Sequence, residues 1–425
     1  MRPVRGDRSR LLIYSQDGLG LGHLRRTTLL ASEFLGTCAG GAALTICDSP
    51  TGQFFEAARG HDYLKLPSIR KVRPGEWSPV SLALGFETVL DIRQELIRTA
   101  ALRFEPDVLL VDHMPHGSMG ELVPTLEALA DTPTRKVLGL RDILDDPGTV
   151  RRRWTLEGAF SAVERHFDQV LVYGSRDVFD VAAEYRWPAH LAQRMHYCGY
   201  VCARTPGPCT ALRRRYLQGR EVGTKLILAM AGGGADAFPL FDAILAALPT
   251  ILTHRLCRLV LVTGPFLPRD QLAALRRRAR DLPVKLLSTV SDSLSHMAAA
   301  DLVVTMAGYN TTAELLRVGT PGLLVPRAGP SAEQQMRASL LAQRGWLNWL
   351  PPASLSTDSM ATAVLAGLEP PIGPPPTPPD LGGLERAALQ LTGDAVARST
   401  HVDETLHAVL DQAASGMSIP AVELP

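Results

Sequence analysis

A glycine turn followed by two threonines and a glutamate has the residue types needed to bind a phosphorylated ligand. Gly308 would let a ligand approach the backbone closely, and Thr311 and Thr312 lie where a helix is expected to begin and to present unpaired N–H groups. The N-terminus of a helix favours an anion, most often a phosphate. Glu314, further into the helix, could accept two hydrogen bonds from a ribose diol. Alternatively, the threonines cap the helix and Glu314 completes a capping box.

A glycine-rich loop that ends in a histidine is the second candidate site. The loop follows an apolar run at 11–14 and precedes a predicted helix at 24–34. Its alternating glycines are Gly18, Gly20 and Gly22. The backbone of such a tight loop can line a ligand pocket. His23 follows directly, and a neutral imidazole could take the proton from an attacking hydroxyl because it titrates near neutral pH.

The residues of this loop by themselves allow two interpretations. The loop could be a dinucleotide-binding fingerprint, with Asp48 as the acidic residue expected further along the chain. Against this, the third glycine comes one position early, and Arg25 and Arg26 are bulky where close packing is required. The loop could also be a plain strand–helix turn, with His23 as a helix-start side chain.

Polar residues directly follow two strand-like apolar runs in the first half of the chain. They are Asp112 and His113 after the run 108–111, and Arg141 and Asp142 after the run 136–140. Parallel strands present their carboxyl ends at one edge of a sheet, so these side chains are expected to form one wall of a cleft. They could bind an acceptor or orient His23, with capping and turn chemistry as the alternative. The next segment, 145–148, is typical of a turn.

No metal site is expected. His113 and His116 have a suggestive spacing, but no carboxylate pair completes a set of ligands. Cys198 and Cys202 lack a second close pair and a following histidine cluster.

Three consecutive glycines in the second half form a further candidate loop. Gly232, Gly233 and Gly234 follow the strand-like run 225–230 and precede a predicted helix. Their backbone could cradle phosphates or contact a transferred sugar. The loop is not a P-loop, because no Gly-Lys-Ser/Thr follows it.

The elements that must position these residues alternate along the whole chain. Short apolar or β-branched runs predict buried strands, and each is followed by a helix-like segment. Strand–helix–strand units of this kind build parallel sheets. With 425 residues, the chain is expected to form two domains.

Composition indicates a water-soluble chain without a polyanion-binding bias. The net charge of +1 argues neither for nor against a polyanion partner, and 46% of the residues are hydrophobic. No nucleic-acid partner is expected. The six scattered cysteines fit reduced thiols in a cytoplasm. The N-terminal apolar run is too short for a signal peptide, and no window reaches transmembrane length. We expect a cytoplasmic protein, with docking at a membrane surface left open.

The stretch 301–337 resembles the donor-binding motif of GT-B glycosyltransferases with a family 28 C-terminal domain. It is similar to that motif in the GlcNAc transferases that build the lipid-linked peptidoglycan intermediate. The resemblance implies that the small-residue turn binds the diphosphate of a UDP-sugar and that Glu314 holds the uridine ribose. The implied donor-binding residues are Gly233, Gly234, Val290, Gly308, Asn310, Thr311, Thr312, Glu314, Gln334 and Gln335. Tyr309-Asn310 departs from the small residues usual at this place in the family.

The loop at 15–26 resembles the N-terminal glycine loop of the same enzymes, which often ends in Gly-His. The resemblance implies that His23 is the catalytic base. It also implies an acceptor side formed by Gly18, Gly20, Gly22, Asp112, His113 and Arg141.

This resemblance implies an α/β fold with two Rossmann-like domains facing across a cleft, the GT-B type. The expected divisions are an acceptor domain at 1–204, a donor domain at 205–369, and a proline-rich linker with C-terminal helices at 370–425. Two helices are expected in this last part, at 383–391 and 402–414.

The implied activity is transfer of a hexosyl group from a nucleotide-diphosphate sugar, with a UDP-sugar favoured, to a hydroxyl acceptor. The reaction is expected to be inverting and independent of metal, with the nucleotide sugar as co-substrate and no cofactor. A sugar-nucleotide 2-epimerase of the same fold and a nucleotide-sugar-binding protein without turnover are the alternatives. An NAD-dependent enzyme is a third.

Overall fold

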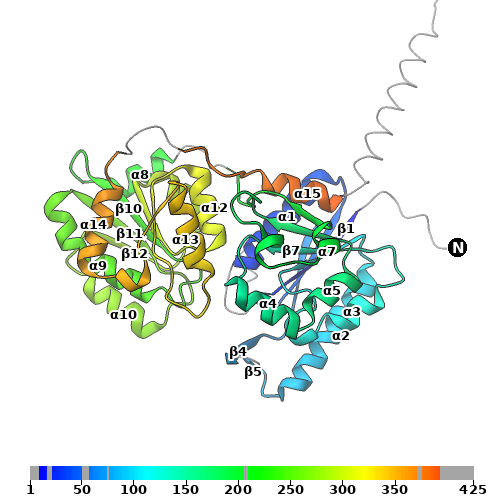
Figure 1. Cartoon of the computed structure of the whole chain (residues 1–425). Coiled ribbons are helices and arrows are strands. Elements are labelled where there is room, and N and C mark those ends of the chain that lie inside the picture. Colours follow the sequence, from blue (N-terminus) through cyan, green and yellow to red (C-terminus); the bar gives the residue numbers. More distant parts are fainter. Residues whose placement is uncertain are drawn as a thin grey trace, which may run out of the picture.

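The computed structural model describes residues 9–16, 22–49, 57–73, 76–204, 206, 209–370 and 376–392. They form two α/β lobes, each built around one parallel sheet (Figure 1). Each sheet separates two hydrophobic clusters, and each lobe therefore has the layered core of an open parallel sheet. The predicted α/β class is confirmed.

The first lobe contains a seven-stranded sheet with the order β3-β2-β1-β6-β7-β8-β9. Its strands are β1 (Arg10–Ser15), β2 (Ala42–Cys47), β3 (His61–Lys65), β6 (Val108–Asp112), β7 (Arg135–Arg141), β8 (Gln169–Tyr173) and β9 (Met195–Tyr197). Strands β6 and β8 are buried at every position because helices cover both faces, which explains their continuous apolar sequences. Ser15 pairs with Asp112, so the loop after β1 begins beside the carboxyl end of β6.

The helices of this lobe connect successive strands. They are α1 (Gly22–Thr37), α2 (Phe86–Phe104), α3 (Val123–Ala128), α4 (Pro147–Leu156), α5 (Ala159–His166), α6 (Val181–Glu184) and α7 (Ala189–Ala192), with a 3₁₀ turn, η2, at Ser118–Gly120. A small antiparallel pair, β4 (Ile69–Arg73) and β5 (Glu76–Pro79), leads into α2.

The second lobe contains a six-stranded parallel sheet with the order β12-β11-β10-β13-β14-β15. Its strands are β10 (Lys225–Met230), β11 (Cys257–Val262), β12 (Val284–Leu287), β13 (Leu302–Thr305), β14 (Gly322–Leu324) and β15 (Asn348–Trp349). Its helices are α8 (Thr210–Leu217), α9 (Phe238–His254), α10 (Arg269–Arg278), α11 (Ser293–Ala299), α12 (Tyr309–Val318), α13 (Glu333–Gln343) and α14 (Thr357–Gly367), with a 3₁₀ turn, η3, at Pro352–Ser354. The strand order reverses at β10 here and at β1 in the first lobe, and open α/β sheets bind ligands at such switch points.

The chain returns to the first lobe after α14. The helix predicted at 383–391 is present as α15 (Gly383–Thr392), and it packs against α1 (Figure 1). Arg135 Nη2 donates to the carbonyls of Gln390 and Leu391 at 2.7 and 2.8 Å, which satisfies the open C-terminal end of this helix. The helix predicted at 402–414 lies outside the described residues.

The predicted turn at 145–148 is wrong, because this segment begins a helix. Pro147 is the first residue of α4, where its missing N–H costs nothing. The Asp146 side chain accepts a hydrogen bond from the Thr149 backbone N–H at 2.9 Å and caps the helix. Within the residues that the structure describes, no helix is long and apolar enough to cross a membrane.

Candidate active site

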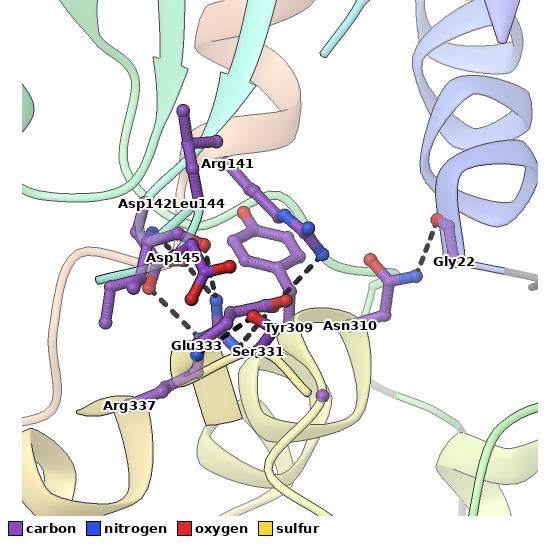
Figure 2. A network of polar contacts seen from close by, with 12 residues as sticks. Gly22, Arg141, Asp142, Leu144, Asp145, Tyr309, Asn310, Ser331, Glu333 and Arg337 are labelled. Carbon is purple, nitrogen blue, oxygen red and sulfur yellow. Dashed lines mark hydrogen bonds and ion pairs between the residues drawn. The ribbon is translucent and has the colours of Figure 1, made fainter. Parts of the chain in front are cut away.

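The N-termini of α1 and α12 meet between the two lobes. Helix α1 begins at Gly22 and α12 begins at Tyr309, after Gly308. The side-chain amide Nδ2 of Asn310 donates to the Gly22 carbonyl at 2.8 Å and joins the two termini (Figure 2). Both helices direct unpaired N–H groups and the positive ends of their dipoles toward this region. A side chain added at Gly308 would meet no described atom within 4 Å, so the α12 terminus is open to a ligand.

The threonines of α12 do not cap their helix. Gly308 is the N-cap residue, and no side-chain hydrogen bond caps the terminus. The Thr312 hydroxyl instead donates to the carbonyls of Gly308 and Tyr309, each at 2.9 Å. Thr311 is buried beside it. The capping-box alternative for Glu314 is therefore wrong, because its carboxylate faces other partners.

Glu314 is a buried carboxylate held by a cation from the first lobe. Its side chain is 1% exposed, and its Oε1 lies 2.6 Å from Nη2 of Arg25 on α1. The Ser293 hydroxyl, at the start of α11, donates to Oε2 at 3.4 Å and accepts from Arg25 at 2.6 Å. Burial raises the pKa of Glu314, although Arg25 acts in the opposite direction. Arg25 therefore occupies one of the two oxygens that a ribose diol would need.

His23 forms an imidazole–carboxylate pair with Asp112. His23 Nδ1 lies 2.6 Å from Asp112 Oδ2, and Asp112 is fully buried at the end of β6. Arg26 donates to both oxygens of the same carboxylate, at 2.9 and 2.7 Å. Burial alone would raise the pKa of Asp112, but Arg26 and His23 hold it well below its usual range. Because Asp112 is ionised, His23 must donate from Nδ1, which leaves Nε2 as the basic nitrogen.

His113 lies next to this pair. Its ring centroid is 5.4 Å from that of His23, and its φ of 87° is rare for a residue with a side chain. Burial lowers the pKa of His113 well below its ordinary value, with further contributions from Arg141 and His23, so the ring stays neutral. Its Nδ1 is buried and makes no hydrogen bond to the part of the chain that is described, as is also true of His116 Nδ1. Within those same ranges, no group of three or more His, Cys, Asp or Glu could hold a metal ion.

Arg141 and Asp142 contact the second lobe rather than His23 (Figure 2). Arg141 Nη1 lies 3.0 Å from Glu333 on α13, and Arg337, one turn further along α13, donates to Asp142 at 2.7 Å. Arg337 also donates to Glu333 and to the Ala307 carbonyl, each at 2.9 Å. Burial raises the pKa of Glu333, but Arg141 and then Arg337 lower it below its ordinary value. These four charged side chains join the lobes directly behind the α12 terminus.

The second glycine turn is explained by backbone packing. Gly234 has a φ of +85°, and a Cβ at this position would lie 1.9 Å from the Thr263 carbonyl oxygen. Gly264 has the same constraint, because a Cβ there would lie 2.5 Å from the Gly233 backbone. The turns after β10 and β11 therefore cross in contact, and a role of Gly233 and Gly234 in phosphate binding stays a prediction.

The remaining predicted donor residues lie in the second lobe, and two positions of the first loop are not described. Gln334 Oε1 accepts from the Arg327 N–H at 3.1 Å, and Gln335 Nε2 donates to the Ala328 carbonyl at 3.1 Å. Both glutamines hold the loop between β14 and α13. Val290 packs on one hydrophobic cluster of this lobe, between β12 and α11. Gly18 and Gly20 lie outside the described residues.

Sequence reasoning missed Arg25 and Arg26 on α1, and Glu333 and Arg337 on α13. Arg25 and Arg26 follow His23 directly, and at this position they could have been assigned to the site by proximity alone. Glu333 and Arg337 are four residues apart, which places them on one face of a helix. No sequence signal pairs Arg337 with Asp142, which is 195 positions away.

Comparison with known proteins finds a family model that matches the second lobe. The glycosyltransferase family 28 C-terminal domain matches residues 227–372. The predicted resemblance is confirmed. The match contains β13, α12 and α13, and thus the donor-side residues from Gly308 to Gln335.

Individual relatives extend the similarity to the whole fold. The chain is 33% identical over 139 residues to the UDP-N-acetylglucosamine–N-acetylmuramyl-(pentapeptide) pyrophosphoryl-undecaprenol N-acetylglucosamine transferase of Acidothermus cellulolyticus, covering 32% of this chain and 37% of that protein. An uncharacterized glycosyltransferase of Methanosarcina mazei is 22% identical over 343 residues, which is 77% of this chain and 82% of that protein. The crystal structure of Acinetobacter baumannii MurG aligns with 93% of this chain and 99% of its own, with a TM-score of 0.54 and 14% identity. The two Rossmann-like domains of the GT-B fold are therefore confirmed.

Proposed function

We propose that this protein is a glycosyltransferase that moves a hexosyl group from a nucleotide-diphosphate sugar to a hydroxyl acceptor. One observation carries the proposal. The α1 and α12 N-termini, joined by Asn310 and Gly22, meet beside the His23–Asp112 pair. The site thus combines two groups of anion-binding N–H donors with one general base.

The reaction is proposed to proceed in a single displacement. His23 Nε2 takes the proton of the acceptor hydroxyl while its oxygen attacks the anomeric carbon from the side opposite the diphosphate. The new glycosidic C–O bond forms as the bond to the diphosphate oxygen breaks, so the configuration inverts. Asp112, held ionised, orients the imidazole and stabilises the imidazolium that results.

The leaving diphosphate is proposed to bind at the start of α12. The open backbone at Gly308 and the N–H groups that follow it, up to Thr311, would neutralise the charge that develops on the leaving group, whereas the Thr312 N–H already donates to the Gly308 carbonyl at 3.0 Å. The arrangement would replace the metal ion that other diphosphate leaving groups require. Gly233, Gly234, Gln334 and Gln335 remain the proposed contacts to the rest of the donor.

The proposed donor is a UDP-sugar, with uracil as its base. The Acidothermus relative is named as a UDP-N-acetylglucosamine–N-acetylmuramyl-(pentapeptide) pyrophosphoryl-undecaprenol N-acetylglucosamine transferase, and the family 28 C-terminal domain matches residues 227–372 of this chain. Glu314 would hold the ribose diol, with Val290 near the base. Binding would require Arg25 to leave the Glu314 carboxylate.

The acceptor is proposed to bind on the first lobe. His113 presents a neutral ring next to His23, and Arg141 lies at the carboxyl end of the neighbouring strand. Gly18, Gly20 and Gly22 remain proposed acceptor-side residues.

The relatives favour transfer over the two alternatives of the same fold, epimerisation and binding without turnover, because they are named as transferases. The two alternatives also differ in a simple test. An epimerase would convert the donor sugar in the absence of an acceptor. A binding protein without turnover would keep its biological effect when His23 is replaced by alanine.

Thermal-shift screening against UDP, GDP, dTDP, CDP and NADH tests the donor site. At a ligand concentration of about 100 times its dissociation constant, a selective ligand should add about 2.7 kcal/mol of stability. We expect this gain for UDP in the wild type and in Glu221→Ala, an exposed control, and its loss in Glu314→Ala. Stabilisation by NADH alone would contradict the proposal and support a dehydrogenase.

A further inference from the structure

Arg26 shares the carboxylate that orients His23. It lies one turn after His23 on α1, and its guanidinium is 2% exposed. Its Nη2 lies 2.9 and 2.7 Å from the two oxygens of Asp112 and 3.1 Å from His23 Nδ1. Since His23 Nδ1 donates to Asp112, the same carboxylate accepts from both Arg26 and His23.

Two tyrosine rings hold the Arg26 guanidinium in place. Its central carbon is 5.3 Å from the ring centroid of Tyr173 and 5.3 Å from that of Tyr309, both within the range of a cation–π interaction. Its Nε is buried and makes no hydrogen bond to any residue that the structure describes. The position of the guanidinium therefore depends on Asp112 and on these two rings.

The two rings come from different lobes. Tyr173 is the last residue of β8 in the first lobe, whereas Tyr309 is the first residue of α12 in the second. The Tyr309 hydroxyl accepts a hydrogen bond from the Val201 N–H of the first lobe at 2.9 Å, so its ring is inserted across the boundary (Figure 2). Arg337 lies 5.7 Å from the same ring centroid. Tyr309 thus links the proposed diphosphate-binding terminus to the carboxylate behind His23.

We propose that Arg26 is a positioning residue for His23, acting through Asp112, and that Tyr309 completes this arrangement only when α12 packs against α1. Under this inference, the general base is assembled only when the donor and acceptor lobes are in contact. Its relevance to catalysis rests on the proposed function.

Charge explains what Arg26 contributes. The Asp112 carboxylate favours a proton on His23, and the adjacent guanidinium offsets this attraction. Loss of Arg26 would remove this offset. Among the described residues, the charged or titratable groups near His23 also include Arg25 on its own helix and His113 after β6.

The tyrosines around Arg26 add no charge of their own. Burial raises the pKa of Tyr173 and of Tyr309 well above the ordinary value, so both rings remain neutral. Their contribution is confined to the position of the Arg26 cation.

The test is an NMR titration of the His23 ring in the full chain, assigned by comparison with His23→Gln. In Arg26→Met we expect the midpoint to rise by about one pH unit or more. Arg26→Lys keeps the cation and should restore a midpoint near that of the wild type. A folded Arg26→Met protein with an unchanged midpoint would overturn the proposal.

A second pair of variants tests the link across the lobes, and decides the matter if Arg26→Met does not fold. Tyr309→Leu removes the ring and should shift the midpoint in the same direction by a smaller amount. Tyr309→Phe keeps the ring and should leave it unchanged. Identical titrations for these two variants would contradict the role of Tyr309.

The titration needs no sugar donor, so it is independent of the proposed function. If Arg26 shifts the His23 midpoint but no nucleotide binds, the charge coupling stands and the transferase proposal fails. If nucleotide sugars are turned over and the midpoint does not respond to Arg26, only the present inference fails.

Discussion

The Arg25–Glu314 pair predicts an asymmetric response to mutation. Glu314 is 1% exposed, whereas Arg25 is 29% exposed and can regain water when its partner is lost. Arg25→Met would leave a buried carboxylate with only a weak contact to Ser293, which we expect to cost about 2–4 kcal/mol of unfolding free energy. Glu314→Gln removes the charge at the buried end and should cost less than about 1 kcal/mol.

The pH dependence follows from the raised pKa of Glu314. A carboxyl group whose pKa is higher in the folded than in the unfolded protein lowers the stability as the pH rises from the unfolded-state pKa through the folded-state pKa. Loss of Arg25 raises this pKa further. The deficit of Arg25→Met should therefore be larger at neutral pH and shrink as the pH falls and Glu314 binds a proton.

Guanidinium unfolding measures these differences, provided that fluorescence and circular dichroism give the same transition. Arg98→Met is the matched control, because its ion pair with Glu95 is 42% and 66% exposed and should contribute less than about 0.5 kcal/mol. Equal costs for Arg25→Met and Glu314→Gln, or a deficit for Arg25→Met that grows at low pH, would refute the reasoning.

Three further predictions concern the lobes and the base. Arg337→Met should cost about 3–5 kcal/mol in denaturant unfolding, because it leaves the buried Asp142 carboxylate without its cation and Glu333 with Arg141 alone; a loss below about 1 kcal/mol would show that the network contributes little. Gly234→Ala should lose at least about 2 kcal/mol in the same assay, whereas Gly232→Ala, with no atom within 4 Å of its Cβ, should stay within about 0.5 kcal/mol. Asp112→Asn should lower kcat by about 100-fold or more while the affinity for UDP is retained, as measured by nucleotide release and calorimetry; unchanged kcat would mean that Asp112 does not orient the base.

The sequence was sufficient for features that arise within one element. Strands such as 108–111 and 302–304 are continuous apolar runs, and the structure places β6 and β13 there. A helix was expected to begin at Thr311 and Thr312 after the Gly308 turn, and α12 begins two residues earlier, at Tyr309. The choice of Asp112 followed from its place at the end of a buried strand.

Features that depend on packing between distant segments could not be predicted. Tyr309 was only a departure from the small residues usual at its position, and its place between Arg26 and Arg337 depends on how two lobes meet. Gly234 was assigned to phosphates because it follows a strand, but the closest constraint on it is the Thr263 carbonyl of another turn. A sequence pattern does not contain such close approaches.

Release of UDP from UDP-sugars in the presence of a panel of hydroxyl acceptors tests the central claim most directly. We predict acceptor-dependent release by the wild type, and a loss of at least about 100-fold in His23→Ala with nucleotide binding retained. Glu314→Ala should lose binding and turnover together. Acceptor-dependent release that persists unchanged in His23→Ala would contradict the assignment of the base, and binding of UDP without any turnover would contradict the assignment as a transferase.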